Sequence, residues 1–123
     1  MVTEKAVEST EENHESVDVL TSTREVIKTA LEKLGYTEEV YELLKSPLRM
    51  LTVRIPVRMD DGKVKVFTGY RAQHNDSVGP TKGGIRFHPD ATERDVEALA
   101  IWMTLQAGIV DLPYGGAKGG VVC

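Results

Sequence analysis

The spacing of apolar residues divides the chain into helical and extended segments. Apolar residues recur mostly every three or four positions between residues 17 and 34, which predicts an amphipathic helix that ends before Gly35. A short helix is expected from Glu38 to Lys45, because Pro47 follows it. Apolar and polar residues then alternate strictly from Leu51 to Arg58, and this alternation predicts a half-buried strand.

The alternating strand is expected to open a hairpin at the edge of a sheet. Asp60-Asp61-Gly62 has the composition of a tight turn, and residues 63–70 are the expected returning strand. Pro56 cannot donate a backbone hydrogen bond, so the first strand is predicted to lie at a sheet edge.

A further helix is predicted from Thr92, which can form a capping box with Asp95, to about Gly108. Two glycine-rich segments, residues 79–84 and 115–120, flank this helix, and each contains one Lys-Gly-Gly sequence. We interpret both as loops, in which glycines take positive φ values and let the backbone approach a ligand. In this interpretation a strand begins only at residue 121.

A single lysine in a glycine-rich turn is more often a solvated surface group than a binding group. Two such turns around one helix favour a site, because two fixed ammonium groups suit a small dianion. A lysine that is partly desolvated beside another cation can also act as a base near neutral pH. From the residues alone, the roles of Lys82 and Lys118 stay open. Neither segment has the order of residues found in a phosphate-binding P-loop or a dinucleotide fingerprint.

Charge and cysteine content exclude several classes of protein. The net charge is −4, and residues 1–18 hold six acids against one lysine. We therefore expect an acidic, disordered tail over residues 1–16, followed by one domain over residues 17–123 that has no nucleic-acid footprint. The one cysteine, Cys123, and the absence of an apolar span or signal peptide favour the cytoplasm and no membrane contact. His74 and His88 lack the spacing of metal ligands, so no metal site is predicted.

Four stretches carry a family resemblance: residues 49–57, 67–71, 79–89 and 112–120. Together they resemble the N-terminal, substrate-binding part of bacterial glutamate dehydrogenases, within the wider Glu/Leu/Phe/Val dehydrogenases. The resemblance implies an α+β fold with N-terminal helices, then a mixed sheet with an edge hairpin and a helix between two glycine-rich lysine loops. It also implies a substrate domain that is incomplete here and lacks the Rossmann domain, in a protein that assembles as a homo-hexamer.

The resemblance also implies roles for single residues. Lys118 corresponds to the catalytic lysine, which helps to activate the water exchanged with the substrate's imine. Lys82 corresponds to the lysine that pairs with the distal carboxylate of glutamate, and Gly83 lets the backbone approach the substrate. Met103 is expected to line the same pocket, one helical turn before Gln106. Gln106 departs from the family, which usually has a third lysine there for the α-carboxylate of the substrate.

The implied reaction is the reversible oxidative deamination of L-glutamate to 2-oxoglutarate and ammonium, with hydride transfer to NAD or NADP. The cofactor would bind to a domain beyond residue 123, because a strand that begins at the last residues predicts the first part of a longer protein. We expect the isolated chain to be inactive. Two alternatives remain, a truncated or decayed copy that acts only as an assembly partner, and a dehydrogenase for an apolar amino acid.

Overall fold

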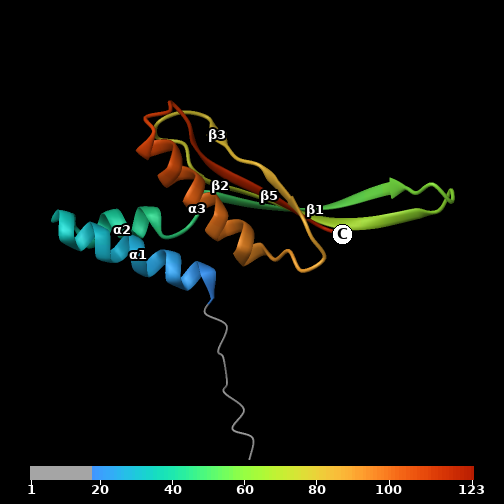
Figure 1. Ribbon diagram of the computed structural model, residues 1–123, viewed down its shortest axis with the longest axis horizontal. Coiled ribbons are helices and arrows are strands. Elements are labelled where there is room, and N and C mark those ends of the chain that lie inside the picture. The colour runs from blue at the N-terminus through green and yellow to red at the C-terminus, as the bar shows by residue number, and fades with distance from the viewer. Residues whose placement is uncertain (1–17) are drawn as a thin grey trace, which may run out of the picture.

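The computed structural model describes residues 18–123, which form an α+β fold around a five-stranded mixed sheet (Figure 1). The helices are α1 (Val19–Leu34), α2 (Glu38–Leu44) and α3 (Glu93–Ile109). The strands are β1 (Arg49–Arg58), β2 (Val64–Asn75), β3 (Thr81–Lys82), β4 (Ile85–Phe87) and β5 (Gly115–Val122). The predicted fold class is confirmed. The acidic tail predicted for residues 1–16 lies outside the described residues.

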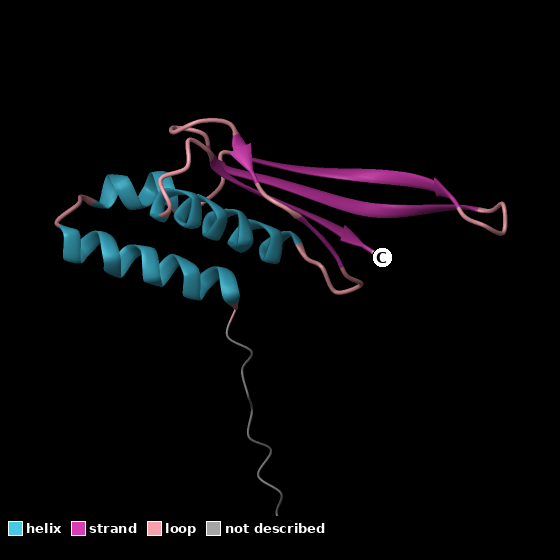
Figure 2. Cartoon of the chain, turned by 45° about the horizontal axis from the view of Figure 1, so that its top comes forward, coloured by secondary structure: helices cyan, strands magenta, loops and turns pink. Residues whose placement is uncertain are grey.

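The sheet combines an antiparallel half and a parallel half. Strands β1, β2 and β5 pair antiparallel in that order, while β3 and β4 both pair parallel with β5. Strand β1 lies at the edge, as Pro56 predicted. Figure 2 shows the hairpin of β1 and β2 extending past the helices. Its turn contains Gly62, whose φ of 81° is closed to most other residues.

The second glycine-rich segment is a strand and not a loop. Strand β5 begins at Gly115, and it has β2 on one side and β3 and β4 on the other. The prediction that a strand starts only at residue 121 was therefore wrong. The expectation of positive φ was also wrong, because the described glycines with positive φ are Gly35 and Gly62, outside both segments. Backbone partners on both sides hold the glycine run extended despite its low β-propensity.

The predicted helices form, and the predicted capping box of α3 and the predicted stop of α1 at Gly35 are confirmed. Thr92 and Asp95 make the complete capping box of α3, with Asp95 N donating to Thr92 Oγ1 at 3.1 Å. The Asp18 side chain caps α1 by accepting from the backbone N–H of Thr21 at 3.2 Å. Gly35 ends α1 in the left-handed conformation. These caps satisfy backbone groups that a helix end otherwise leaves unpaired.

Helix α3 lies between the sheet and α1, and α2 packs against α1 (Figures 1 and 2). One buried cluster joins α3 to the sheet and contains Ala72, Val96 and Ala100. A second cluster joins α3 to α1 and contains Leu20, Ile27, Ala98 and Ile101. Because α3 is apolar on both sides, it holds the two layers together.

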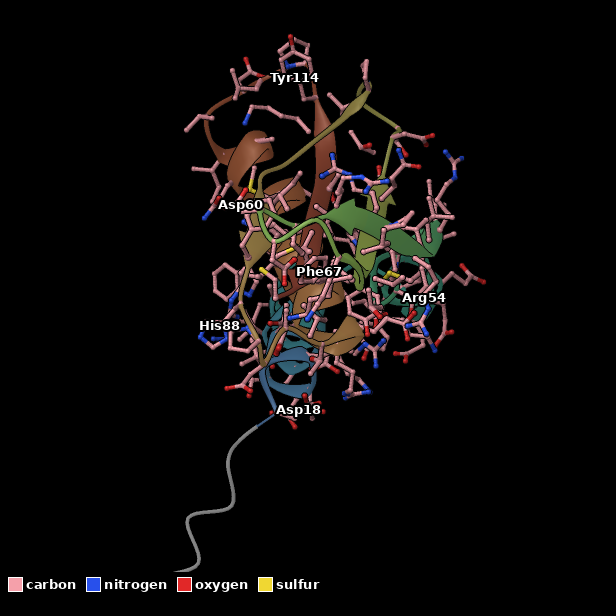
Figure 3. The ribbon with its side chains drawn as sticks, turned by 90° about the vertical axis from the view of Figure 1, so that its right-hand side faces the viewer. Asp18, Arg54, Asp60, Phe67, His88 and Tyr114 are labelled. Atoms are coloured by element: carbon pink, nitrogen blue, oxygen red, sulfur yellow. The ribbon has the colours of Figure 1, made fainter. Side chains whose placement is uncertain are left out.

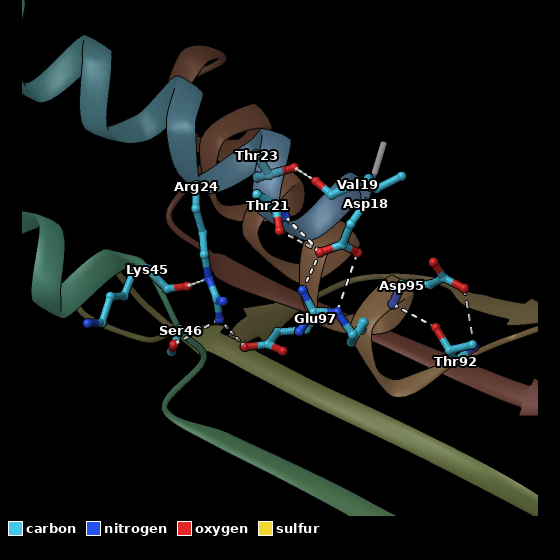
Figure 4. A network of polar contacts seen from close by, with 11 residues as sticks. Asp18, Val19, Thr21, Thr23, Arg24, Lys45, Ser46, Thr92, Asp95 and Glu97 are labelled. Carbon is cyan, nitrogen blue, oxygen red and sulfur yellow. Dashed lines mark hydrogen bonds and ion pairs between the residues drawn. The ribbon is translucent and has the colours of Figure 1, made fainter. Parts of the chain in front are cut away.

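Polar contacts fix α1 against α3 at the rim of this second cluster (Figure 4). The Arg24 guanidinium donates to the carbonyl of Lys45 at 2.7 Å and to the Glu97 carboxylate at 3.0 Å. Arg94 pairs with Asp18, and the hydrogen bond from Arg94 holds the pKa of that exposed carboxyl below its ordinary value. These bonds tie α1, α3 and the connection after α2 into one unit.

The opposite face of the sheet carries apolar side chains that no described element covers. Leu51 and Val53 share this face because they pair with Arg71 and Gly69, which alternate with the α3-facing Ala72. The exposed large residues of this face are Leu51 at 58%, Val53 at 37%, Val57 at 39%, Ile85 at 57% and Phe87 at 66%. The apolar side of β1 is thus exposed in residues 18–123, and the half-buried strand predicted there was wrong.

A buried histidine of β2 connects this strand with α2 and α3. His74 in β2 is 1% exposed, and its two ring nitrogens lie 2.7 Å from the carbonyl oxygen of Leu44 and 2.7 Å from Oγ1 of Thr104. A carbonyl can only accept, so Nε2 carries the proton, and Nδ1 of the neutral ring accepts from the threonine hydroxyl. Burial lowers the pKa of His74 below 6.5, while the bond to Leu44 acts in the opposite direction.

We expect Gly116→Ala to destabilise the fold by about 3 kcal/mol, because a side chain at Gly116 would overlap the backbone of α3 at Thr104 and Ala100. Gly108→Ala is the matched control, since nothing lies within 4 Å of a side chain at that helical position. The control should stabilise the protein by up to about 1 kcal/mol. Urea unfolding followed by circular dichroism measures both. If Gly116→Ala had the same unfolding midpoint as Gly108→Ala, α3 would not be in close contact with β5 at Gly116.

We expect acidification from pH 7 to pH 5 to lower the free energy of unfolding through His74. The unfolded imidazole takes up a proton below 6.5, whereas the native imidazole has a lowered pKa and resists protonation. Stability is therefore complete above pH 6.5 and falls below it, by at most about 1.4 kcal/mol per pH unit. Asp18 acts only below about pH 4, where its unfolded form titrates. A His74→Gln variant should have a flatter profile, and identical slopes would contradict the assignment.

Candidate functional site

The two Lys-Gly-Gly segments lie side by side in the sheet. The register pairs Lys82 of β3 with Gly116 of β5, and the N–H of Gly119 donates to the carbonyl of Gly84 at 2.9 Å. Segments more than 30 positions apart in the sequence are thus joined by backbone hydrogen bonds. This pairing places Lys82 opposite Gly116, two residues before Lys118 on β5.

Both lysines lie on the side of the sheet that α3 covers. Side chains at Gly116 and Gly120 would meet atoms of α3, so Lys118, midway between them on one strand, points to the same side. Lys82 pairs with Gly116 and shares that face. The Lys118 ammonium passes over the edge of β5, because Nζ lies 3.5 Å from the position that a side chain of Gly84 would take.

A cavity of about 210 Å³ lies between β3, the start of β5 and the last turns of α3. Its lining residues are Lys82, Met103, Gln106, Ala107, Val110, Leu112 and Gly115. The cavity therefore lies near Tyr114, at the end of the molecule away from Asp18 in Figure 3. Its size suits a small molecule, and its wall is apolar apart from one ammonium and one amide.

Three of the residues predicted to bind substrate line this cavity, namely Lys82, Met103 and Gln106. Gly83 and Lys118 do not line it. Gly83 follows the lining residue Lys82 in the chain, and Lys118 Nζ lies 3.5 Å from the position that a side chain of Gly84 would take. Sequence reasoning missed the apolar walls of the cavity. Val110 could have been found by continuing the helical spacing from Met103 and Gln106, whereas Leu112 and Gly115 follow the helix and carry no such signal.

Gly83 is required by the packing of two strands. A side chain at Gly83 would overlap the carbonyl oxygen of Ala117 in β5, and Gly83 has no positive φ. Any larger residue would push β3 and β4 away from β5 and move Lys82. The close approach that the sequence predicted thus occurs between backbones, and an approach to substrate stays a prediction.

Gln106 gives the cavity a neutral polar group instead of a second cation. Gln106 is exposed, and its side-chain amide makes no hydrogen bond within residues 18–123, although its backbone carbonyl accepts from the N–H of Val110 at 3.3 Å. Its amide can donate two hydrogen bonds and accept others. Among the lining residues, Lys82 is the one cation. A ligand with two carboxylates would meet one charged partner and one neutral partner in this wall.

A larger open hollow of about 540 Å³ lies on the outer face of α1. Its lining residues are Ser22, Glu25, Val26, Thr29, Ala30 and Lys33, all from one helix. Neither lysine of the Lys-Gly-Gly segments contributes to it. We place the site at the smaller cavity, because several elements converge there with the polar groups that the sequence singled out.

The described helix ends do not suit a dinucleotide. The first turn of α2 contains Glu38 and Glu39, that of α3 contains Glu93 and Asp95, and Asp18 caps α1. Pyrophosphate binding favours a glycine-rich turn at a helix N-terminus, and carboxylates there repel it. Residues 18–123 thus do not fit a nicotinamide cofactor, and we derive no step through one.

Two further properties concern the described residues alone. None of their helices has the length and apolar character needed to cross a membrane. In the same residues, no three His, Cys, Asp or Glu side chains form a group that could hold a metal ion.

Residues 47–123 match the dimerisation domain of the Glu/Leu/Phe/Val dehydrogenases. The chain belongs to this family. The match starts just before β1 and includes both Lys-Gly-Gly segments and α3. The family predicted from the four sequence stretches is therefore confirmed.

Members of this family among curated proteins are close in sequence. The chain is 68% identical over 126 residues to the cryptic catabolic NAD-specific glutamate dehydrogenase of Bacillus subtilis, covering 100% of this chain and 29% of that protein. It is 69% identical over 109 residues to the NAD-specific glutamate dehydrogenase of Staphylococcus aureus, covering 89% and 26%. The chain thus spans less than a third of these relatives.

Solved glutamate dehydrogenases have the same fold over the same share of their length. The enzyme of Peptoniphilus asaccharolyticus superposes with a TM-score of 0.82 at 51% identity, covering 86% of this chain and 27% of that one. A hetero-hexameric glutamate dehydrogenase of Thermus thermophilus, in its Leu-bound form, gives 0.79 at 42% identity, covering 96% and 27%. The fold seen in this member of the family is that of the matching part of these enzymes.

Proposed function

We propose that this chain is the N-terminal, substrate-binding segment of an NAD-dependent glutamate dehydrogenase. The reaction converts L-glutamate, water and NAD⁺ into 2-oxoglutarate, ammonium, NADH and a proton, and it is reversible. The observation that carries the proposal is the cavity in which Lys82 faces Met103 and Gln106, with Lys118 beside it. NAD is proposed because the curated relatives are NAD-specific, and it would bind outside residues 18–123.

Each polar residue of the site receives a role in this proposal. Lys82 pairs with the distal carboxylate of glutamate through a charge-assisted hydrogen bond, which is stronger than a neutral one. Gln106 donates its amide protons to the α-carboxylate. Lys118 helps to activate the water that adds to the imine, and Met103 packs against the carbon chain of the substrate.

The proposal includes assembly into a homo-hexamer. The uncovered face of the sheet, with Leu51 and Phe87 more than half exposed, is an apolar surface of the kind that subunit contacts bury. The unpaired edge of β1 adjoins this face. The matched domain is described as a dimerisation domain, and one structural relative is hetero-hexameric.

Gln106 also supports a second candidate, a non-catalytic subunit that joins the assembly of an active relative. A site with one cation binds a dicarboxylate less tightly than a site with two, and an assembly partner does not need tight substrate binding. The two candidates differ in one measurable property. Gln106→Lys in a full-length protein should raise glutamate-dependent NADH formation if the protein is an enzyme. An unchanged absence of activity would favour the partner role.

We expect the 123-residue chain to bind 2-oxoglutarate. Lys82→Met should weaken this binding by about 10- to 100-fold, because a hydrogen bond to a charged group contributes about 1.5–3 kcal/mol. Gln106→Lys should tighten it by about tenfold for the same reason. Isothermal titration calorimetry measures the dissociation constants. Lys63→Met is the control, since this lysine lies at the hairpin tip and its side chain is 85% exposed.

Three outcomes of this titration would overturn the proposal. The control could weaken binding as much as Lys82→Met does, which would show attraction by net charge alone. The chain could bind L-leucine in preference to 2-oxoglutarate, which would favour a dehydrogenase for apolar amino acids. No binding of 2-oxoglutarate at all would remove the substrate assignment. We further expect no NADH formation from glutamate by the isolated chain.

A further inference from the structure

His74 and Thr104 form the polar contact between the C-terminal half of α3 and the sheet. Within residues 18–123, the other side-chain hydrogen bonds from α3 to another element start nearer its N-terminus and reach Asp18, Thr23, Arg24 or Thr52. Three of these four partners lie at α1, on the far side of α3 from the sheet. Among the side-chain hydrogen bonds of residues 18–123, only the one between His74 and Thr104 links the last turns of α3 to β2.

Thr104 is in direct contact with the strand that carries the site. Its backbone nitrogen and Oγ1 occupy the space where a side chain of Gly116 would lie, and Gly116 is the register partner of Lys82. One threonine therefore touches the buried histidine on one side and the lysine-bearing strands on the other. Its position sets how α3 lies over this part of the sheet.

The cavity wall depends on the rotation of α3 about its axis. At 100° per residue, the four wall residues Met103, Gln106, Ala107 and Val110 fall in an arc of about 100°, whose centre lies about 110° from Thr104. A rotation of about 20° would move a side-chain atom 6 Å from the axis by roughly 2 Å. Shifts of about 1 Å in a site can cost large factors in activity. The wall needs a rotational anchor, and Thr104 is placed to supply it.

We propose that His74 is a positioning residue that holds Thr104, and through it fixes the rotation of α3 so that Met103 and Gln106 face Lys82. The ring suits this role because it is buried and has a single tautomer. Leu44 fixes the proton on Nε2, which leaves Nδ1 as an acceptor aimed at the threonine hydroxyl. The effect on ligand affinity rests on the proposed function, while the effect on the helix does not.

The test compares Thr104→Val with Thr104→Ser and with Thr23→Val in the 123-residue chain. Thr104→Val removes the hydroxyl and keeps the shape, and Thr104→Ser keeps the hydroxyl. Thr23→Val is the matched control, because it removes the hydroxyl that accepts from Trp102 Nε1 at 2.9 Å between α1 and α3, away from the cavity. The readouts are amide hydrogen exchange over residues 103–110, the methyl NMR signal of Met103, and the dissociation constant for 2-oxoglutarate.

We expect Thr104→Val to speed exchange over residues 103–110 by about tenfold, to shift the Met103 signal, and to weaken 2-oxoglutarate binding by about tenfold. Thr104→Ser and Thr23→Val should leave the Met103 signal and the affinity near those of the unmodified chain. The proposal is overturned if Thr104→Val and Thr23→Val behave alike, or if Thr104→Val leaves exchange and the Met103 signal unchanged. It is also overturned if exchange rises while a measurable affinity stays constant. If the unmodified chain binds no 2-oxoglutarate, the proposed function fails, and exchange and the Met103 signal still decide the role of His74.

Discussion

The close contact between α3 and β5 is the constraint on which the rest of the structure depends. It exists because Gly116 and Gly120 have no side chains, so the helix lies almost on the backbone of the strand. Because α3 lies so close to β5, the Lys118 side chain has no room to extend away from the sheet between these glycines. It instead reaches over the edge of the strand toward Gly84. The same contact brings the last turns of α3 beside Lys82. The cavity is thus a product of helix-to-strand packing.

Glycine serves a different purpose here from the one that its sequence pattern indicated. Around the two lysines, glycines were expected to form loops with positive φ. Neither Gly83 nor Gly116 has a positive φ. Instead, the missing side chain of Gly83 makes room for the carbonyl of Ala117, and that of Gly116 makes room for α3. Strands of the sheet therefore carry both lysines, and elements of regular structure hold side chains more accurately than loops do.

The sequence was sufficient for elements with a local signal. Thr92 with Asp95 predicted the start of α3, Gly35 predicted the end of α1, and Pro56 predicted an edge strand, because caps and proline act through neighbouring residues. Strand β5 could not be predicted in this way. A run of glycines shows no alternation, and its extended form depends on hydrogen bonds from β2, β3 and β4, which are far away in the sequence. Helical spacing placed Met103 with Gln106, and the family resemblance added Lys82 to their pocket. In the structure it is the pairing of β3 with β5 that places Lys82 at the cavity.

Gln106 has two opposing effects on this cavity. A second cation beside Lys82 would attract a dicarboxylate, but in the empty protein the two like charges would repel each other across a small, largely apolar space. The neutral amide removes that repulsion. It also lowers the attraction for a dianion, because a neutral donor contributes less than a charged one. Stability of the free site and affinity for the ligand thus change in opposite directions at this one position, as is common where function requires like charges to be held together.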